Sequence, residues 1–277
     1  MDYSVLMSVY IKEKANNLRE SIDSMLNQTA PLSDFVIVCD GPLTEELDSL
    51  LDEYKDNYPD IFQIVRLPEN KQLGNALRTG LPECRYNLVA RMDSDDIACP
   101  DRMEKLLKLL EDESVAAAGG YIREFHTDSQ EEDFIRAVPL THEEIVKMIG
   151  KRNPMNHVTV VFKKDRVLEV GSYIEINRFE DYWLWARLIL AGYRLVNTDD
   201  ICVRVRADGM FQRRKGKAFF KGALQFQKLM RQSGLISFPR YVLNIIIWFF
   251  ATMVADKRIA QFVYQRCLRK TGQNGNN

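Results

Sequence analysis

Three aspartates directly follow an apolar run in segment 88–97, which reads Leu-Val-Ala-Arg-Met-Asp-Ser-Asp-Asp-Ile. The run predicts a buried strand, with Asp93, Asp95 and Asp96 at its carboxyl end. Neighbouring carboxylates repel one another and are costly to desolvate, so stability alone does not explain the cluster. Hard oxygen ligands favour Mg²⁺ or Mn²⁺, shared with a substrate phosphate. The alternative is a solvated acidic turn that caps the helix expected from Asp101.

A second pair of carboxylates, Glu180 and Asp181, stands where a helix over 181–191 is predicted to start, and Trp183 and Trp185 follow closely. A helix N-terminus favours negative charge, so we expect an ionised carboxylate that accepts a proton from a hydroxyl. The tryptophans would offer a flat apolar surface to a sugar ring. The alternative is a helix cap followed by aromatic residues of the core.

The elements that must position these groups alternate between strand and helix over residues 1–110, with short connections. This alternation predicts a parallel, doubly wound α/β sheet with right-handed crossovers. Tyr10, Asp40, Asp93 and Asp95 all follow strand ends, at the edge where such sheets bind ligands. The strands are expected at 4–9, 35–39, 62–65 and 88–93, and the helices at 16–28, from 44 onward, at 70–81 and at 101–110.

Residues 111–205 predict an α+β region that extends the same sheet and forms an acceptor side. His157, after Asn-Pro-Met-Asn, could reach the active site, although a lone histidine near a strand is more often a satisfied core residue. We expect strands at 115–120, 121–125 and 157–162, a polar loop at 127–132, and helices at 142–149, 165–170 and 181–191.

The C-terminal part of the chain has a different charge. Residues 201–277 carry fifteen Lys and Arg and two Asp and Glu, whereas residues 1–200 carry twenty-three and thirty-seven. A basic tail on an acidic body suggests an anionic partner. The basic cluster from Arg204 to Lys221 could grip a diphosphate, or it could be a solvated face.

The segment 241–254 is intensely apolar but only fourteen residues long. A bilayer-spanning helix needs about 20 residues, so this one is too short to cross. It fits a helix that lies in a membrane interface, or equally a packing or dimerisation helix. We expect a basic, amphipathic helical extension over 206–270 and a disordered tail over 271–277.

The five cysteines are scattered, odd in number and without a CxxC pair. They argue against a structural zinc site and for a reducing compartment. The N-terminus shows no basic leader, so a cytoplasmic protein is expected. The basic residues are not interleaved with aromatic residues in a recognised module, which argues against nucleic-acid binding.

The order of these features resembles the inverting family 2 glycosyltransferases of bacterial surface-polysaccharide type. The resemblance covers about residues 3–200 and implies a GT-A fold over 1–205. Residues 1–110 would form the nucleotide-sugar half and 111–205 the acceptor half. The matching segments are 4–10, 38–41, 70–74, 93–96 and 180–181.

The resemblance also implies roles on the donor side. Tyr10 and Asp40 would line the nucleotide base pocket, with Asp40 accepting from the uracil N–H, and Lys71 would belong to the same donor site. Asp93 would approach the ribose or a metal ion, and Asp95 would ligate Mn²⁺ or Mg²⁺ that bridges the diphosphate.

In the metal site, the resemblance implies that Asp96 is a helper of Asp95. On the acceptor side, it implies that Asp181 is the catalytic base and that Glu180 orients the acceptor or the base. The enzyme would move one sugar from a UDP-sugar to a hydroxyl of a glycan, with undecaprenyl diphosphate as the expected carrier, in capsule, O-antigen or exopolysaccharide synthesis. It would sit peripherally on the inner face of the cell membrane, with a homodimer possible. No Gln-x-x-Arg-Trp motif of processive synthases is present.

The main alternative is a nucleotidyltransferase-like or sugar-nucleotide-binding protein that transfers no sugar. A nucleotidyltransferase should carry a glycine-rich, basic phosphate loop after its first strand, and segment 8–12 is not such a loop. Asp181 favours glycosyl transfer over mere binding.

Overall fold

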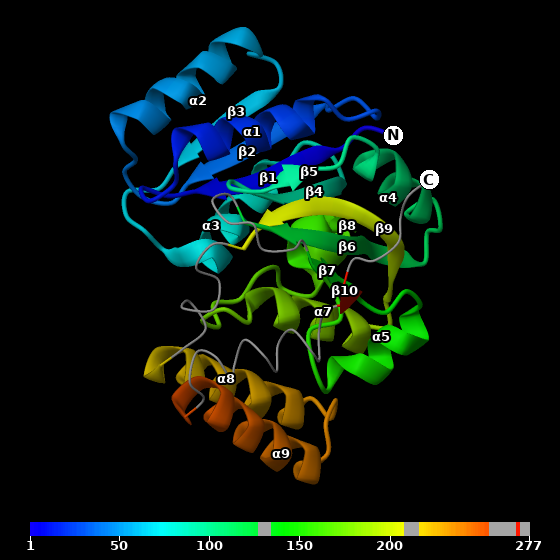
Figure 1. Ribbon diagram of the computed structural model, residues 1–277. Helices are drawn as coiled ribbons and strands as arrows, with labels where there is room; N and C mark the ends of the chain where they lie inside the picture. The colour runs from blue at the N-terminus through cyan, green and yellow to red at the C-terminus, as the bar shows by residue number, and fades with distance from the viewer. Residues whose placement is uncertain (127–133, 208–215, 255–269, 272–277) are drawn as a thin grey trace.

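The computed structural model describes residues 1–126, 134–207, 216–254 and 270–271 (Figure 1). These residues form one mixed sheet of ten strands with helices on both faces. The strand order is β10-β7-β6-β8-β4-β1-β2-β3, and β9 pairs with both β5 and β6. The predicted GT-A-like α/β class is confirmed.

The first half of the sheet is parallel, as predicted. In space its strands lie in the order β3-β2-β1-β4, and a helix follows each strand. The strands are β1 (Ser4–Val9), β2 (Asp34–Cys39), β3 (Phe62–Arg66) and β4 (Leu88–Asp93). The helices are α1 (Ala15–Leu26), α2 (Glu45–Asn57), α3 (Gln72–Gly80) and α4 (Arg102–Leu109), and a 3₁₀ turn, Leu81–Glu83, follows α3.

Local interactions explain where α2 begins and how closely α3 packs on the sheet. The side chain of Thr44 accepts a hydrogen bond from the Leu47 N–H, and acidic residues fill the first turn of α2, where they suit the helix dipole. A Cβ at Gly80 would lie 2.4 Å from Val38 and 2.7 Å from Leu6. Glycine therefore lets the end of α3 pack directly on β1 and β2.

The sheet continues into the second half through β8, which runs antiparallel to β4. Next to β8 lies β6, which in turn pairs with β7 and with β9. The bounds are β5 (Ile97–Ala98), β6 (Val115–Phe125), β7 (Phe134–Arg136), β8 (Val161–Lys163), β9 (Arg194–Arg206) and β10 (Lys270–Thr271). The helices are α5 (His142–Ile149), α6 (Lys164–Glu169) and α7 (Glu180–Leu190).

Two predictions for this half were wrong in detail. Gly119 and Gly120 do not separate two strands but lie inside the single strand β6, where the register to β9 shifts. A Cβ at Gly120 would lie 2.4 Å from the Cys202 sulfur, so glycine is needed for close approach of β9. The strand expected at 157–162 is a 3₁₀ helix, His157–Thr159, followed by β8. The loop expected at 127–132 lies outside the described residues.

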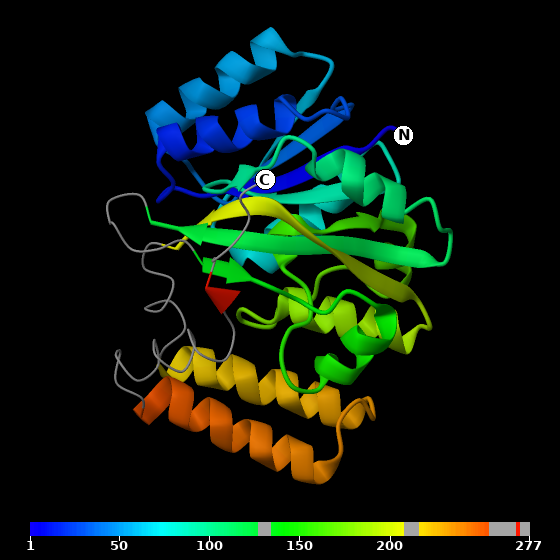
Figure 2. The same ribbon diagram turned by 45° about the vertical axis from the view of Figure 1, so that its right-hand side comes forward.

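Two apolar cores occupy the two faces of the sheet. One contains side chains of α1, α2 and α4, and the other contains side chains of α3, α5, α6, α7 and α8. An antiparallel pair of helices covers the outside of the second of these cores (Figure 2). The two helices are α8 (Lys217–Gln232) and α9 (Phe238–Phe249). A short π-helical turn, Phe250–Val254, prolongs α9.

Aromatic residues join this helical pair to α7. The Phe179 ring stacks on Phe226 with centroids 5.1 Å apart, and it meets Trp248 edge-on at 5.5 Å. The side chain of Asn244 donates to the carbonyl of Gly150 at 3.0 Å. Within the described residues, no helix has the length and apolar character needed to cross a membrane. The aromatic contacts and the Asn244 hydrogen bond pack the pair on the second core.

Candidate active site

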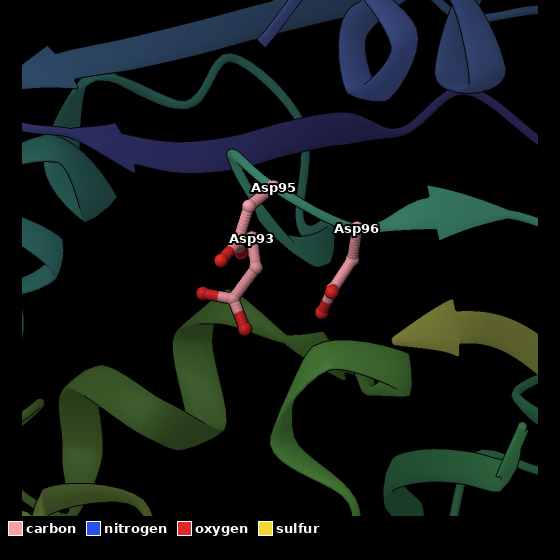
Figure 3. Close-up of side chains that lie close together, drawn as sticks. All are labelled: Asp93, Asp95 and Asp96. Carbon is pink, nitrogen blue, oxygen red and sulfur yellow. The ribbon is translucent and has the colours of Figure 1, made fainter. Parts of the chain in front are cut away.

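The three aspartates of the acidic turn converge at the carboxyl edge of the sheet (Figure 3). Asp93 ends β4, and Asp95 and Asp96 follow in the turn before β5. One carboxylate oxygen from each lies within 4.8 Å of the others. Asp93 and Asp95 are partly exposed and Asp96 is buried. A set of hard oxygen donors on an accessible edge fits Mg²⁺ or Mn²⁺.

Arg206, the last residue of β9, holds this turn in place. Its backbone N–H donates to the Asp96 carboxylate at 2.9 Å, and its side-chain Nε donates to the Asp95 carbonyl at 2.8 Å. Burial and the charges of Asp93 and Asp95 raise the pKa of Asp96 well above its usual range. One oxygen of Asp96 is therefore committed to the fold, which leaves Asp93 and Asp95 as the more available ligands.

Arg91 lies buried next to the turn, and the sequence pattern predicted no role for it. It forms an ion pair with Asp93 through one guanidinium nitrogen. Its Nε and Nη1 atoms have no hydrogen-bond partner among the described residues. A charged residue in the middle of an apolar run was the available signal, because buried charges are seldom left unpaired.

Glu180 and Asp181 form the first turn of α7, where both side chains are half-buried. The side-chain amide of Asn153 donates to Asp181 at 2.7 Å. Burial and the charge of Asp181 raise the pKa of Glu180 to about 7, and burial also raises the pKa of Asp181. Both pKa values move opposite to the direction that the helix dipole alone would give, because desolvation outweighs the dipole here.

Arg91 links the two acidic groups electrostatically. Its charge opposes the rise in the pKa of both Glu180 and Asp181, and it also pairs with Asp93. The charge of the buried Arg91 guanidinium therefore acts on both the acidic turn and the start of α7. The structure brings together the two carboxylate groups that the sequence showed 87 residues apart, at Asp93 and Glu180.

The aromatic surface expected beside the base is not present. Trp183 is 8 % exposed and Trp185 is fully buried, so both belong to the core. His157 is partly buried, with its Nε2 2.9 Å from the Tyr173 hydroxyl. Burial and Arg91 lower the pKa of His157 well below its usual range, so its ring is neutral. The core interpretation is correct for the two tryptophans.

The residues predicted for the donor side lie at the same edge of the sheet, one strand or more from Asp93. Tyr10 follows β1 and is 36 % exposed, and Asp40 follows β2 and is buried. The Asp40 carboxylate accepts a hydrogen bond of 2.6 Å from the Lys71 backbone N–H. The Lys71 side chain is exposed, with its ammonium 3.9 Å from Glu69. The contact between Asp40 and Lys71 was not predicted, because it joins two loops.

The helix α3, which begins after Lys71, also approaches the start of α7. A Cβ at Gly74 of α3 would lie 3.2 Å from the Cβ of Glu180. This contact would be tighter than most, so a side chain at position 74 would require Glu180 to move by a few tenths of an ångström. The position of the acidic pair therefore depends on the helix that begins beside Lys71.

Comparison with known proteins decides the family. Residues 4–176, more than half of the chain, match the sequence profile of glycosyl transferase family 2. The chain belongs to this family. The amylovoran biosynthesis glycosyltransferase AmsE of Erwinia amylovora is 35% identical over 269 residues, which span 95% of this chain and 98% of AmsE. The family predicted from the motifs is thus confirmed, and with it a hexosyltransferase-type enzyme.

Two further proteins are similar over nearly the whole chain. The Escherichia coli UDP-Gal:alpha-D-GlcNAc-diphosphoundecaprenol beta-1,3-galactosyltransferase is 30% identical, over 97% of each chain. The mannosyltransferase PcManGT from Pyrobaculum calidifontis, solved in complex with GDP-Man and Mn²⁺, superposes with a TM-score of 0.61 at 16% identity. The match covers 95% of this chain and 79% of PcManGT, and it shows a shared fold.

Proposed function

We propose that this glycosyltransferase moves one sugar, with inversion, from a UDP-sugar to a hydroxyl of a lipid-linked glycan during surface-polysaccharide synthesis. The observation that carries the proposal is the arrangement around Arg91. An acidic turn whose carboxylates could hold a cation and a half-buried carboxylate pair are both within the electrostatic influence of Arg91, and the turn lies at the edge of the sheet where α/β folds bind ligands. Glycosyl transfer needs both groups, one for the leaving diphosphate and one for the incoming hydroxyl.

Asp95 and Asp93 would hold Mg²⁺ or Mn²⁺, with Asp96 supporting the turn. When bound, the cation supplies positive charge against the charge that develops on the departing diphosphate. The ion pair to Arg91 occupies an oxygen of Asp93, so Asp93 would use its other oxygen for the cation or the ribose. PcManGT, which shares the fold and was solved with Mn²⁺, supports a divalent cation at this turn.

Asp181 would take the proton from the acceptor hydroxyl as that oxygen attacks the anomeric carbon, on the face opposite the diphosphate. The hydrogen bond from Asn153 orients Asp181 and favours its ionised form. Glu180, with a pKa raised to about 7, would be partly protonated near neutral pH, and it would orient the acceptor. A base with a raised pKa holds its proton more firmly, which favours proton transfer near neutral pH.

The hydrogen bonding of Asp40 supports uracil as the base. One carboxylate oxygen already accepts from the Lys71 N–H, which leaves the other oxygen as the main acceptor. Uracil offers a single N–H at this edge, whereas guanine offers two adjacent donors that suit a carboxylate with both oxygens available. Tyr10, exposed at the end of the neighbouring strand, would pack against the base.

The acceptor class is proposed from the relatives. AmsE bears the name of amylovoran biosynthesis, and the E. coli relative is named for a diphosphoundecaprenol-linked substrate. An acceptor of that kind lies at a membrane, so we place the enzyme peripherally on the inner face of the cell membrane. The exposed residues in the described part of the basic cluster, Arg204, Lys217 and Lys221, would meet anionic groups there.

The test is hydrolysis of a panel of sugar nucleotides with Mn²⁺ or with EDTA. We expect cleavage of one UDP-sugar, only with metal, and a loss of at least about 100-fold in the D95A variant. The control is D101N, because Asp101 lies near the turn but is paired with Lys105 at 2.7 Å. Transfer to a lipid-linked acceptor, measured separately, should fail in D181N.

The outcomes separate the parts of the proposal. Cleavage of a GDP-sugar alone would contradict the role of Asp40. Donor binding without any transfer by the wild-type protein would favour a sugar-nucleotide-binding protein. Equal activity with EDTA would remove the metal from the proposal.

A further inference from the structure

The outer face of α9 exposes an unusual amount of apolar surface. Eight of the sixteen large apolar residues that are exposed in the described part of the chain lie within 238–253. They are Phe238, Val242, Leu243, Ile246, Ile247, Phe249, Phe250 and Met253. Contiguous exposed apolar patches on soluble proteins mark interaction surfaces.

The polar residues of this segment point the other way. Asn244 and Thr252 are buried, and the Asn244 amide donates to both the Gly150 carbonyl and the Gln227 side chain. Tyr241 and Trp248, on the same inner side, are partly buried against the second core. A helix that faced water would have the opposite distribution. The outer face of α9 therefore requires an apolar neighbour.

The charge of the helical pair identifies that neighbour. Residues 216–254 contain five Lys and Arg and no Asp or Glu. Four of the five, Lys217, Lys221, Lys228 and Arg231, are exposed on α8, which lies beside α9 at the same end of the molecule (Figures 1 and 2). Apolar side chains flanked by cations match the acyl and headgroup regions of an anionic bilayer. A two-fold contact between copies would instead bring like charges together.

We propose that the α8–α9 pair is the membrane-docking surface, with α9 lying in the plane of an anionic bilayer and its outer face inserted. This inference rests on the proposed function in one respect only: a lipid-linked acceptor is the reason why docking would be useful. Phe179, at the start of α7, packs on Phe219, Phe226 and Trp248 of the pair. Docking would therefore fix the carboxylates of α7 at a set height above the lipid.

The test is co-sedimentation of the full-length protein with vesicles of phosphatidylcholine alone or with about 30 % phosphatidylglycerol. We expect the protein to prefer the anionic vesicles. The double variant I246E/I247E should bind them at least about 10-fold more weakly. The control is L168E, because Leu168 is 43 % exposed but belongs to α6 and not to the pair. K221E should weaken binding to anionic vesicles by about fivefold.

Three results would overturn the proposal. The wild-type protein could stay in the supernatant with both vesicle types, or I246E/I247E could bind like wild type. Sedimentation velocity could instead show a wild-type dimer that I246E/I247E dissociates, without vesicle binding, and α9 would then be an interface between copies. Hydrolysis of sugar nucleotides by the same preparations reports on the proposed function separately, because it needs no bilayer.

Discussion

The guanidinium of Arg91 pairs with the Asp93 carboxylate at the base of the acidic turn, with the arginine side chain buried and the aspartate side chain 39 % exposed. Buried charge is costly without a partner. Here the Arg91 guanidinium contacts Asp93 directly, and its positive charge also acts to lower the pKa values of Asp96, Glu180 and Asp181. Arg91 is best regarded as a positioning residue on which both carboxylate groups depend.

Replacing this cation should make stability more dependent on pH. Without the charge, the carboxyl groups around it hold their protons to still higher pH in the folded protein, so stability falls more steeply as pH rises. The melting temperature of R91M should therefore approach that of wild type at about pH 5 and lie well below it at about pH 8. Differential scanning fluorimetry at both values measures the effect.

The control for this variant is R19M. Arg19 pairs with Glu53 on the surface, with both side chains nearly half exposed. Its loss should have a small effect that changes little with pH, because solvent screens an exposed pair. A deficit in R91M of equal size at both pH values would show that Arg91 acts by packing alone.

The hydrogen bond from Asn153 to Asp181 should be visible in the pH dependence of transfer. The amide favours the ionised carboxylate, so N153A should raise the pKa of Asp181 further. The acidic limb of kcat/KM should move to higher pH, with a greater loss at about pH 6.5 than at about pH 8.5. N27A is the control, because the Asn27 amide only caps the end of α1. A loss independent of pH would assign Asn153 a purely steric role.

Glu180 should reduce stability in the neutral range. Its folded pKa of about 7 lies above the ordinary value of 4.5, so between these values the folded protein binds more protons than the unfolded chain. Stability then falls as pH rises through this window. E180Q removes the titration and should gain about 1–3 kcal/mol relative to wild type at about pH 8, with little gain at about pH 4.5.

Denaturant unfolding at the two pH values measures this gain. The matched control is E143Q, because Glu143 also lies in the first turn of a helix, α5, but is exposed. A gain that is equal at both pH values, or that also occurs in E143Q, would mean that burial of Glu180 is not its cause.

Gly74 should affect activity more than stability. An alanine there would bring its Cβ to 3.2 Å from the Glu180 Cβ, while its better helix propensity contributes about 1 kcal/mol in compensation. G74A should keep its melting temperature within a few degrees and lose transfer activity several-fold. R78A is the control on the same helix, since Arg78 is exposed. Full activity in G74A would show that the position of Glu180 tolerates displacement.

The sequence predicted the parallel half of the sheet well, for a physical reason. Strands buried on both faces are continuous apolar runs, and caps such as Thr44 mark the helix starts. The strand β9 was missed because its charged residues, among them Asp199, Asp200 and Arg204, interrupt the alternation that predicts a strand. Its pairing with β6 and β5 is a tertiary contact.

The candidate site divides in the same way. Asp93, Asp95 and Asp181 could be found from charge density at element ends. The part played by Arg91 could not, because a single arginine in a strand is ambiguous until its neighbours are placed. The shared hydrogen bond of Asp40 and Lys71 likewise depends on two loops that meet only in the folded protein. The sequence pattern therefore predicts which charged residues belong to the candidate site, whereas their contact partners depend on tertiary packing.

The packing of Phe179 and Tyr182 against the C-terminal helices constrains how such enzymes can be recombined. Both rings lie within the same core as Phe226 of α8, with the Tyr182 and Phe226 centroids 4.4 Å apart. A chimaera that takes only the C-terminal helices from a relative would join two halves of an aromatic core that were never selected together. A chimaera that keeps this core intact must therefore carry the start of α7 along with α8 and α9.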